Sequence, residues 1–319
     1  MTRRRALALV LLLAASCSDG GTEVATDDEP TDDRASSTTT TTEQEPGTAP
    51  IIVADGTTIG RIVDGVIEPV GVLDGTVTVA YGDGHGTYAA EVEGELVVLY
   101  GGEQRIVDPE RPGRVVLYDL LWHEGAPHAL YGVREDDGEP SGAIVLHDLD
   151  TGQQQDLGQG YAVEHHTSTV SLRNGLLATS STADLTEVVE IRPLDGKVDE
   201  DAWTPTKDLE YNAPPFVSSA VLAPDGETIA WLSGPDHDGM TNQPDVGSWE
   251  VVVADLAGNE RHRIAVDVDD EVPAQLDYDG TRVLVSRRTG DAPASPLLID
   301  LPNGTQGRLP INGTATFEG

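Results

Sequence analysis

The chain has 319 residues, of which 56 are acidic and 19 basic, so its formal net charge at pH 7 is −37. This balance argues against a nucleic-acid partner, because phosphate binding requires a basic surface. Anionic lipid headgroups would also repel the chain, so membrane attachment would need a hydrophobic anchor. The acidic excess is itself typical of proteins that stay soluble at high ionic strength. Cys17 is the single cysteine, which excludes a disulfide within the chain.

The first 16 residues have the parts of an export signal. Arginines at positions 3–5 precede an apolar run over residues 6–15, which at about ten residues is too short to span a bilayer. The segment Leu13-Ala14-Ala15-Ser16-Cys17 resembles the bacterial lipobox, with Ala14 in place of the usual leucine. This resemblance implies lipid attachment to Cys17 and anchoring at the outer face of the cytoplasmic membrane or in the cell envelope. An ordinary secretory signal is the alternative.

Residues 17–50 do not have the composition of a folded segment. They consist mainly of Thr, Ser, Asp, Glu, Pro and Gly, and Val24 is the only large aliphatic side chain. Such a segment cannot form a hydrophobic core, so we expect a disordered acidic tether. Like charges extend a chain of this kind, which would lift residues 51–319, the expected folded domain, away from a membrane.

Short β-branched runs follow from Ile51 onward and predict strands rather than helices. The clearest runs are Val77-Thr78-Val79, Leu96-Val97-Val98-Leu99, Val115-Val116-Leu117, Ile144-Val145-Leu146, Val251-Val252-Val253 and Val283-Leu284-Val285. The longest interval without Gly or Pro, residues 176–192, still contains Thr179 to Thr182 and two adjacent valines, which disfavour a helix. We therefore expect an all-β domain with almost no helix.

Turn motifs recur along this domain. A leucine followed by a glycine-containing turn stands at positions 149, 194, 256 and 301, at spacings of 45, 62 and 45 residues. A second set, Asn174-Gly175, Asp225-Gly226 and Asp279-Gly280, has the composition of tight hairpins between two apolar strands. The unit Val115 to Leu157 keeps the leucine turn and lacks the hairpin motif. A period near 45 with four short strands is typical of a β-propeller blade, with an insertion at residues 234–248.

The segment Val221 to Trp231, with Pro224-Asp225-Gly226 at its turn, resembles the repeat of TolB-like propellers, and residues 272–304 repeat the pattern more weakly. The resemblance implies a propeller. About 270 residues at this period predict six four-stranded blades, with five or seven blades or a two-sheet sandwich as alternatives. Ile51 to Val72, together with Ile311 to Phe317, would form the composite blade that closes the ring.

Long loops are expected to gather on one face of such a ring, because they join the second and third strands or successive blades. They are residues 135–142, 158–166, 198–215, 234–248 and 267–271. Loops over a rigid scaffold are common binding surfaces. The candidate ligand or partner residues on this face are Glu164, His165, His166, Asp236, His237, Asp238, Asp267, Asp269, Asp270, Trp203 and Trp249. The acidic and histidine clusters among them suggest calcium or zinc, although none has a defined ligand spacing, and solvated loops are the alternative.

The tryptophans provide a further hypothesis. Trp203 and Trp249 border long loops and could line a carbohydrate groove, whereas Trp122 and Trp231 end apolar strands and are expected to pack inside. The segment Gly82-Asp83-Gly84-His85-Gly86 lacks the spacing of a nucleotide-binding loop and is expected to be a wide hairpin turn.

The sequence contains no Gly-x-Ser-x-Gly nucleophile motif and no phosphate-binding loop. The favoured hypothesis is a monomeric, non-enzymatic lipoprotein whose propeller recognises a protein or an envelope component such as a glycan. An extracytoplasmic polysaccharide hydrolase or lyase that uses acidic loop residues is the main alternative. A sensor or substrate-binding module that serves another envelope complex is a third hypothesis.

Overall fold

In the computed structural model the chain divides into two units, Met1–Glu45 and Pro46–Gly319. The structure describes only parts of the second unit. The described residues are 49–63, 65–110, 112–134, 144–157, 169–183, 186–195, 215–236, 249–266, 271–290 and 292–319. They contain strands and turns but no helix, as the β-branched runs predict.

The described strands, in chain order, are β1 (Ile51–Asp55), β2 (Thr58–Val63), β3 (Val66–Val72), β4 (Val77–Gly82), β5 (Thr87–Val92), β6 (Glu95–Tyr100), β7 (Glu103–Val107), β8 (Arg114–His123), β9 (Ala126–Arg134), β10 (Ile144–Asp148), β11 (Gln154–Asp156), β12 (Thr169–Arg173), β13 (Leu176–Ala183), β14 (Thr186–Pro193), β15 (Pro215–Leu222), β16 (Thr228–Asp236), β17 (Trp249–Asp255), β18 (Glu260–Val266), β19 (Val272–Tyr278), β20 (Arg282–Thr289), β21 (Ala292–Asp300), β22 (Thr305–Arg308) and β23 (Thr314–Phe317).

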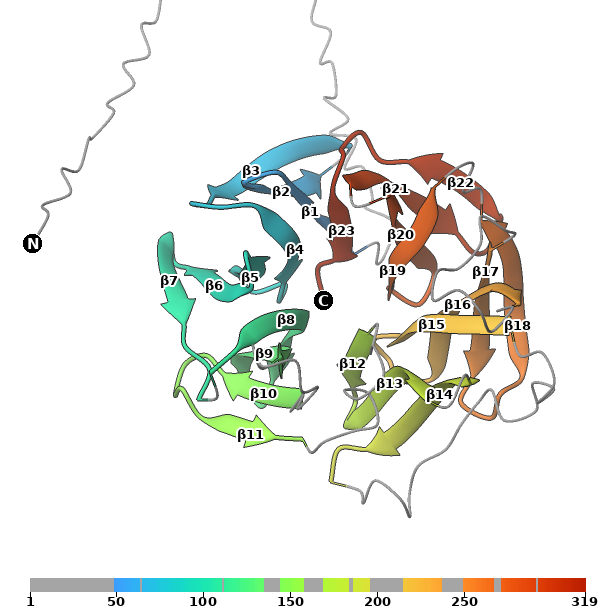
Figure 1. The fold of residues 1–319 in the computed structure, drawn as a ribbon, viewed down its shortest axis with the longest axis horizontal. Coiled ribbons are helices and arrows are strands. Elements are labelled where there is room, and N and C mark those ends of the chain that lie inside the picture. Colours follow the sequence, from blue (N-terminus) through green and yellow to red (C-terminus); the bar gives the residue numbers. More distant parts are fainter. Residues whose placement is uncertain are drawn as a thin grey trace, which may run out of the picture. The chain divides into compact units, whose positions relative to one another are not determined.

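These strands form six antiparallel sheets around a common centre, which is the architecture of a six-bladed β-propeller (Figure 1). Five sheets have four strands each, and the sheet β12-β13-β14 has three strands among the described residues. The innermost strands of successive blades are β23, β4, β8, β12, β15 and β19 (Figure 1). We number the blades 1 to 6 in that order. The predicted blade count of six is confirmed.

Blade 1 closes the ring by joining the two ends of the domain. Its strand order is β23-β1-β2-β3, with Ile51 paired to Phe317 and Ala54 paired to Thr314. The hydroxyls of Thr314 and Thr316 donate to backbone carbonyls of β4, at 2.9 and 2.7 Å. The composite blade expected from the sequence is therefore present, and side chains tie its inner strand to the next blade.

The hydrophobic core is divided into six layers, one at each junction between neighbouring blades. A central strand thus meets an apolar layer on both of its faces, which is why its sequence is a continuous apolar run rather than an alternating one. In β6, for example, Leu96 and Val98 belong to the layer facing blade 3, and Val97 belongs to the layer facing blade 1. The outermost strand of blade 6, β22, is exposed along its whole length.

The hairpin motifs lie where the sequence predicts them, between the first and second strands of blades 4, 5 and 6. Gly175, Gly226 and Gly280 all have positive φ, the conformation that favours glycine. The expectation that the unit Val115 to Leu157 lacks this turn is wrong. Glu124 and Gly125, with φ of 51° and 87°, form the turn between β8 and β9, so glutamate here adopts the left-handed conformation that Asn or Asp usually takes.

The closing blade offers a sharp test of the packing. A Cβ atom on Gly313, which precedes β23, would lie 1.8 Å from the carbonyl oxygen of Ala54 on β1. Because backbone rather than a flexible side chain occupies that space, we expect Gly313→Ala to lower the free energy of unfolding by about 3 kcal/mol in urea denaturation. Gly307→Ala in β22 is the matched control, since nothing lies within 4 Å of its added Cβ. Equal stability of the two variants would contradict this packing of the closing strand.

Candidate functional site

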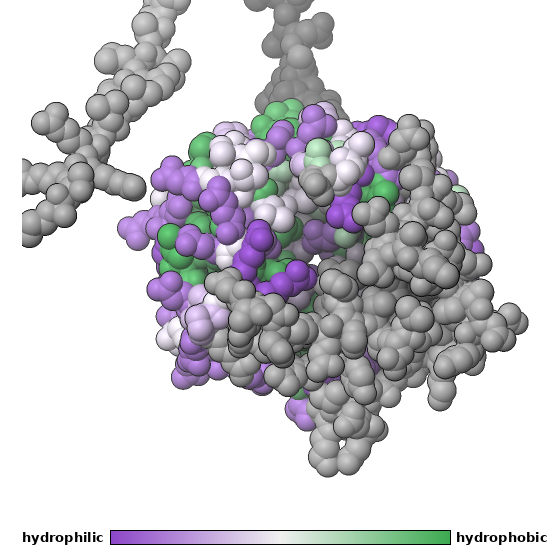
Figure 2. Space-filling view, viewed as in Figure 1, coloured by the Kyte–Doolittle hydropathy of each residue, from purple (hydrophilic) through white to green (hydrophobic). Residues whose placement is uncertain are grey.

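A cavity of about 570 Å³ opens at the centre of the ring, at the end where the innermost strands begin. We call it the axial funnel; Figure 2 shows that the ring is hollowed at its centre. Its walls include the first residues of β4, the middle of β8, Thr169 of β12 and the start of β23. Its lining residues are Ala54, Asp55, Gly56, Thr76, Val77, Thr78, Val79, Tyr81, Glu91, Val116, Leu117, Tyr118, Thr169, Ala274, Gln275, Ser286, Arg287, Arg288, Pro293, Asn312, Gly313 and Thr314.

Two polar side chains, from the blades on either side of blade 1, meet deep in the funnel. Gln275 of β19 donates through Nε2 to the Tyr81 hydroxyl of β4, at 2.6 Å. Tyr81 is only 5% exposed, and its hydroxyl proton has no acceptor among the described residues. The funnel therefore presents a buried hydrogen-bond donor below walls of valine and leucine. Apolar walls with a few placed polar groups are typical of ligand pockets of this volume.

Charged side chains lie on the innermost strands beside this pair. Arg173 at the end of β12 forms an ion pair with Asp119 of β8, and the two side chains are 15% and 8% exposed. Asp277 of β19 accepts backbone N–H groups of Phe317 and Tyr278, at 2.6 and 2.9 Å. We call Tyr81, Asp119, Arg173, Gln275 and Asp277 the axial cluster. Its members come from blades 2, 3, 4 and 6, so the cluster links most of the ring.

Burial controls the ionisation of the axial cluster. Burial, with a further contribution from the carboxylate of Asp119, raises the pKa of Asp277 to about 7. Burial also raises the pKa of Tyr81 well above its ordinary value, so this phenol keeps its proton at neutral pH. Since Asp119 is paired with arginine and Asp277 holds two backbone N–H groups, both carboxylates have structural partners rather than free oxygens aimed at a substrate.

The funnel wall also carries buried and exposed charges. Arg287 donates to the carbonyl oxygen of Ser295 through Nε at 3.0 Å and pairs with the carboxylate of Glu271, whereas Arg288 is exposed. Glu91 accepts the backbone N–H of Leu117 at 3.2 Å, and burial raises its pKa. Cations and a buried carboxyl thus lie on different sides of the same cavity, which favours a ligand with polar groups at more than one position.

The funnel opens at the end of the ring where most of the predicted long loops attach. The chain leaves the described strands at this end after β9, β11, β16 and β18, whereas β14 ends at the opposite end, where Pro193 pairs with Leu176. Most of the predicted face residues lie outside the described residues, namely Glu164, His165, His166, Trp203, His237, Asp238, Asp267, Asp269 and Asp270. Asp236 is the last residue of β16, and its side chain is not described. The prediction that these side chains form a recognition surface stays a prediction.

Trp249 is described, and it lies elsewhere than expected. Its side chain is 1% exposed and belongs to the core layer between blades 5 and 6. Gly234 on the neighbouring strand makes room for the indole, because a Cβ there would lie 2.8 Å from the ring. Trp122, expected inside, is instead 42% exposed at the end of β8 and lies 4.1 Å from the His85 ring. Trp231 is buried as expected.

The remaining predictions concern ions and the membrane. Within the described ranges, no group of three or more His, Cys, Asp or Glu side chains could hold a metal ion, and the clusters proposed for calcium or zinc lie outside those ranges. Cys17 and the export signal also lie outside them. The part of the chain that the structure describes has no helix long and apolar enough to cross a bilayer.

Sequence reasoning did not identify the axial cluster. The sequence does contain a signal for this cluster. Asp119 and Asp277 interrupt apolar stretches of their strands, and a buried charge needs a partner. The members of the cluster, however, are far apart along the chain: Arg173 is 54 residues from Asp119, and Gln275 is 194 residues from Tyr81, and only ring closure brings them together.

No protein-family model matches this sequence, and neither does any curated protein. Solved structures do share the fold. TolB from Acinetobacter baumannii has a TM-score of 0.60 at 12% identity, and the alignment covers 84% of this chain and 66% of that one. A chain in the nidogen/laminin complex gives 0.57 at 10% identity, with coverages of 84% and 98%. The tricorn protease gives 0.53 at 13% identity, with coverages of 84% and 27%. These likenesses show a TolB-like propeller fold and nothing further about activity.

Proposed function

We propose that this TolB-like propeller is a non-enzymatic binding module, exported and anchored through lipid on Cys17, that recognises a protein or an envelope component. The axial funnel carries the proposal. It combines apolar walls, the buried donor Tyr81 and the amide of Gln275 in one cavity, at the end of the ring where most of the long loops attach. A rigid scaffold that presents such a cavity is suited to binding, because little ordering is required when the ligand enters.

Two other observations support a binding role. The carboxylates of the axial cluster are held by Arg173 and by backbone N–H groups, so they are not arranged as a free acid and base. One of the structures with this fold is a complex, that of nidogen with laminin, which supports protein partners in general.

Photo-crosslinking tests the recognition surface. A photoreactive residue at Thr78, which is exposed in the funnel wall, is expected to label a discrete envelope species in membranes that contain the full chain. The same residue at Glu103, exposed on the outer strand β7, serves as the control. Identical labelling from the two positions, or release of sugar from polysaccharides by the purified protein, would contradict the proposed function.

Fatty-acid labelling tests the anchor. We expect a labelled fatty acid to be incorporated into the wild-type protein and not into Cys17→Ser, which should also leave the membrane fraction, because two or three acyl chains are needed for lasting attachment. A Cys17→Ser protein that labels as well as wild type would refute lipidation at this residue.

A further inference from the structure

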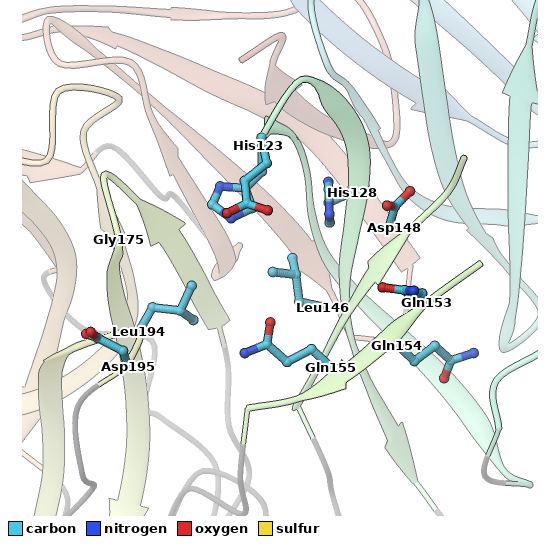
Figure 3. A pocket seen from close by; sticks show the side chains of 11 residues that line it. His123, His128, Leu146, Asp148, Gln153, Gln154, Gln155, Gly175, Leu194 and Asp195 are labelled. Carbon is cyan, nitrogen blue, oxygen red and sulfur yellow. The ribbon is translucent and has the colours of Figure 1, made fainter. Parts of the chain in front are cut away.

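A second cavity lies between blades 3 and 4, at the end of the ring opposite the axial funnel (Figure 3). Its volume is about 510 Å³. Figure 3 shows side chains of blade 3 facing Gly175 and the end of β14 across the opening. The residues that line this interblade pocket are His123, Glu124, His128, Leu146, Asp148, Gln153, Gln154, Gln155, Gly175, Leu194 and Asp195.

The pocket exists because the apolar layer between the two blades ends early. Leu130 and Leu146 are paired across β9 and β10 and belong to that layer. The next pair on the same face, two residues further along, is His128 and Asp148. On the blade 4 side, nothing lies within 4 Å of where a Cβ on Gly175 would be. Polar side chains therefore surround an opening whose floor is Leu146 and Leu194.

His128 presents a hydrogen-bond acceptor at this opening. The residue is 8% exposed, and its Nδ1 lies 3.1 Å from the carbonyl oxygen of Ala126, so Nδ1 must carry the proton. In the neutral ring, Nε2 is then an acceptor, and it has no hydrogen-bond partner among the described residues. The ring of His123 lies edge-on at 5.3 Å and lines the same pocket. Nε2 is not among the fully enclosed side-chain atoms that lack a partner in the described part of the chain, so water or a ligand in the cavity can satisfy it.

The charge of the pocket is negative. Glu124, Asp148 and Asp195 line it, and none of the described lining residues is Lys or Arg. The backbone N–H of Thr151 lowers the pKa of Asp148, so this carboxylate stays ionised at neutral pH. Three carboxylates and two imidazoles make the pocket rich in acceptors. The donors among the described lining side chains are the glutamine amides and one ring N–H of each neutral histidine, and that of His128 is taken by the carbonyl oxygen of Ala126.

We propose that the interblade pocket binds an aliphatic cation, that is, an ammonium or guanidinium group on a short methylene stem. The stem would lie on Leu146 and Leu194, and the charged head would donate to His128 Nε2 and the carboxylates. Charge-assisted hydrogen bonds of this type are about twice as strong as neutral ones. Such a head group could belong to a free amine or to an arginine or lysine side chain of a protein.

Calorimetric titration of the full-length protein tests the proposal. Butylguanidinium is expected to bind at one site, and butylurea, which has the same shape without the charge, is expected to bind about tenfold more weakly or not at all. The peptide acetyl-Gly-Arg-Gly-amide distinguishes the two sources, since tighter binding than butylguanidinium supports a protein segment and equal or weaker binding supports a free amine.

Two variants locate the site. The double variant Glu124→Gln/Asp195→Asn should weaken butylguanidinium binding about tenfold, and His128→Phe should weaken it while keeping a ring in place. Glu227→Gln is the matched control, because it removes an exposed charge at the first hairpin of blade 5, outside the pocket. Equal binding of butylguanidinium and butylurea would overturn the proposal. So would equal weakening by Glu227→Gln, which would indicate attraction to the net charge alone.

Discussion

Arg173→Met is expected to lower the free energy of unfolding at pH 8 by about 3–5 kcal/mol, measured by urea denaturation. Arg173 lies near the ring axis and forms an ion pair with Asp119 inside the protein. It also acts electrostatically on Asp277. Methionine keeps most of the packing volume but leaves both carboxylates without their cation, and an unpaired buried charge is strongly destabilising. The loss should be smaller at pH 5, because protonation of Asp277 removes one of the two negative charges.

The same replacement at Arg263 is the control. Arg263 on the outer strand β18 forms ion pairs with Glu260 on the same strand and with Glu250 on β17, and all three side chains are more than one-third exposed. Exposed pairs of this kind contribute at most about 1 kcal/mol. If Arg263→Met is as destabilising as Arg173→Met, the axial cluster has no special role in holding the blades together.

Asp277→Asn is expected to gain stability relative to wild type as the pH rises from 4 to 8, by up to about 4 kcal/mol. Folding raises the pKa of Asp277 from its ordinary value of 3.8 to about 7. Below pH 3.8 the carboxyl is protonated in both the folded and the unfolded state, so its raised pKa does not lower the free energy of unfolding. Between pH 4 and 7 only the unfolded chain ionises, which favours unfolding, and above pH 7 the cost is constant. Asparagine does not ionise and avoids this cost.

Comparison of the two proteins in urea at several pH values isolates this effect from the other carboxylates, which both proteins share. Carbon-detected NMR of the Asp277 carboxyl should show a pKa of about 7 in wild type and a lower pKa in Asp119→Asn, because Asp119 contributes to the rise. A stability difference that stays constant from pH 4 to pH 8 would show that Asp277 is ionised throughout.

Both stability tests concern the assembly of the ring, and the funnel depends on that assembly. Asp277 accepts the N–H of Phe317 on the closing strand, and Gln275, two residues earlier, donates to Tyr81 on β4. The side chains that hold β19 against blades 1 and 2 therefore also shape the deep part of the funnel. An axial-cluster variant that loses its fold is therefore expected to lose ligand binding in the funnel as well.

The fold could be predicted because it repeats. Asp225-Gly226 and Asp279-Gly280 indicate hairpins that local chemistry alone determines, since glycine takes a positive φ at little cost. The period near 45 residues then sets the blade count, and the apolar runs at both ends of the domain suggest the composite blade that β1 and β23 form. Glu124 in the left-handed conformation was missed because glutamate rarely takes that role, and here the pairing of β8 with β9 outweighs the local preference.

The sequence by itself determined the class of the domain, many of its strands and turns, and its period, because strand and turn preferences act over a few residues. Only the tertiary structure decided which polar side chains meet. Asp119, Arg173 and Asp277, for example, come from separate blades. Trp249 is buried and Trp122 is exposed, the reverse of what the sequence predicts, because the space beside Gly234 and the end of β8 exist only in the folded ring. Contacts between residues far apart in the chain carry no local signal, so the funnel and the interblade pocket could not be predicted from the sequence.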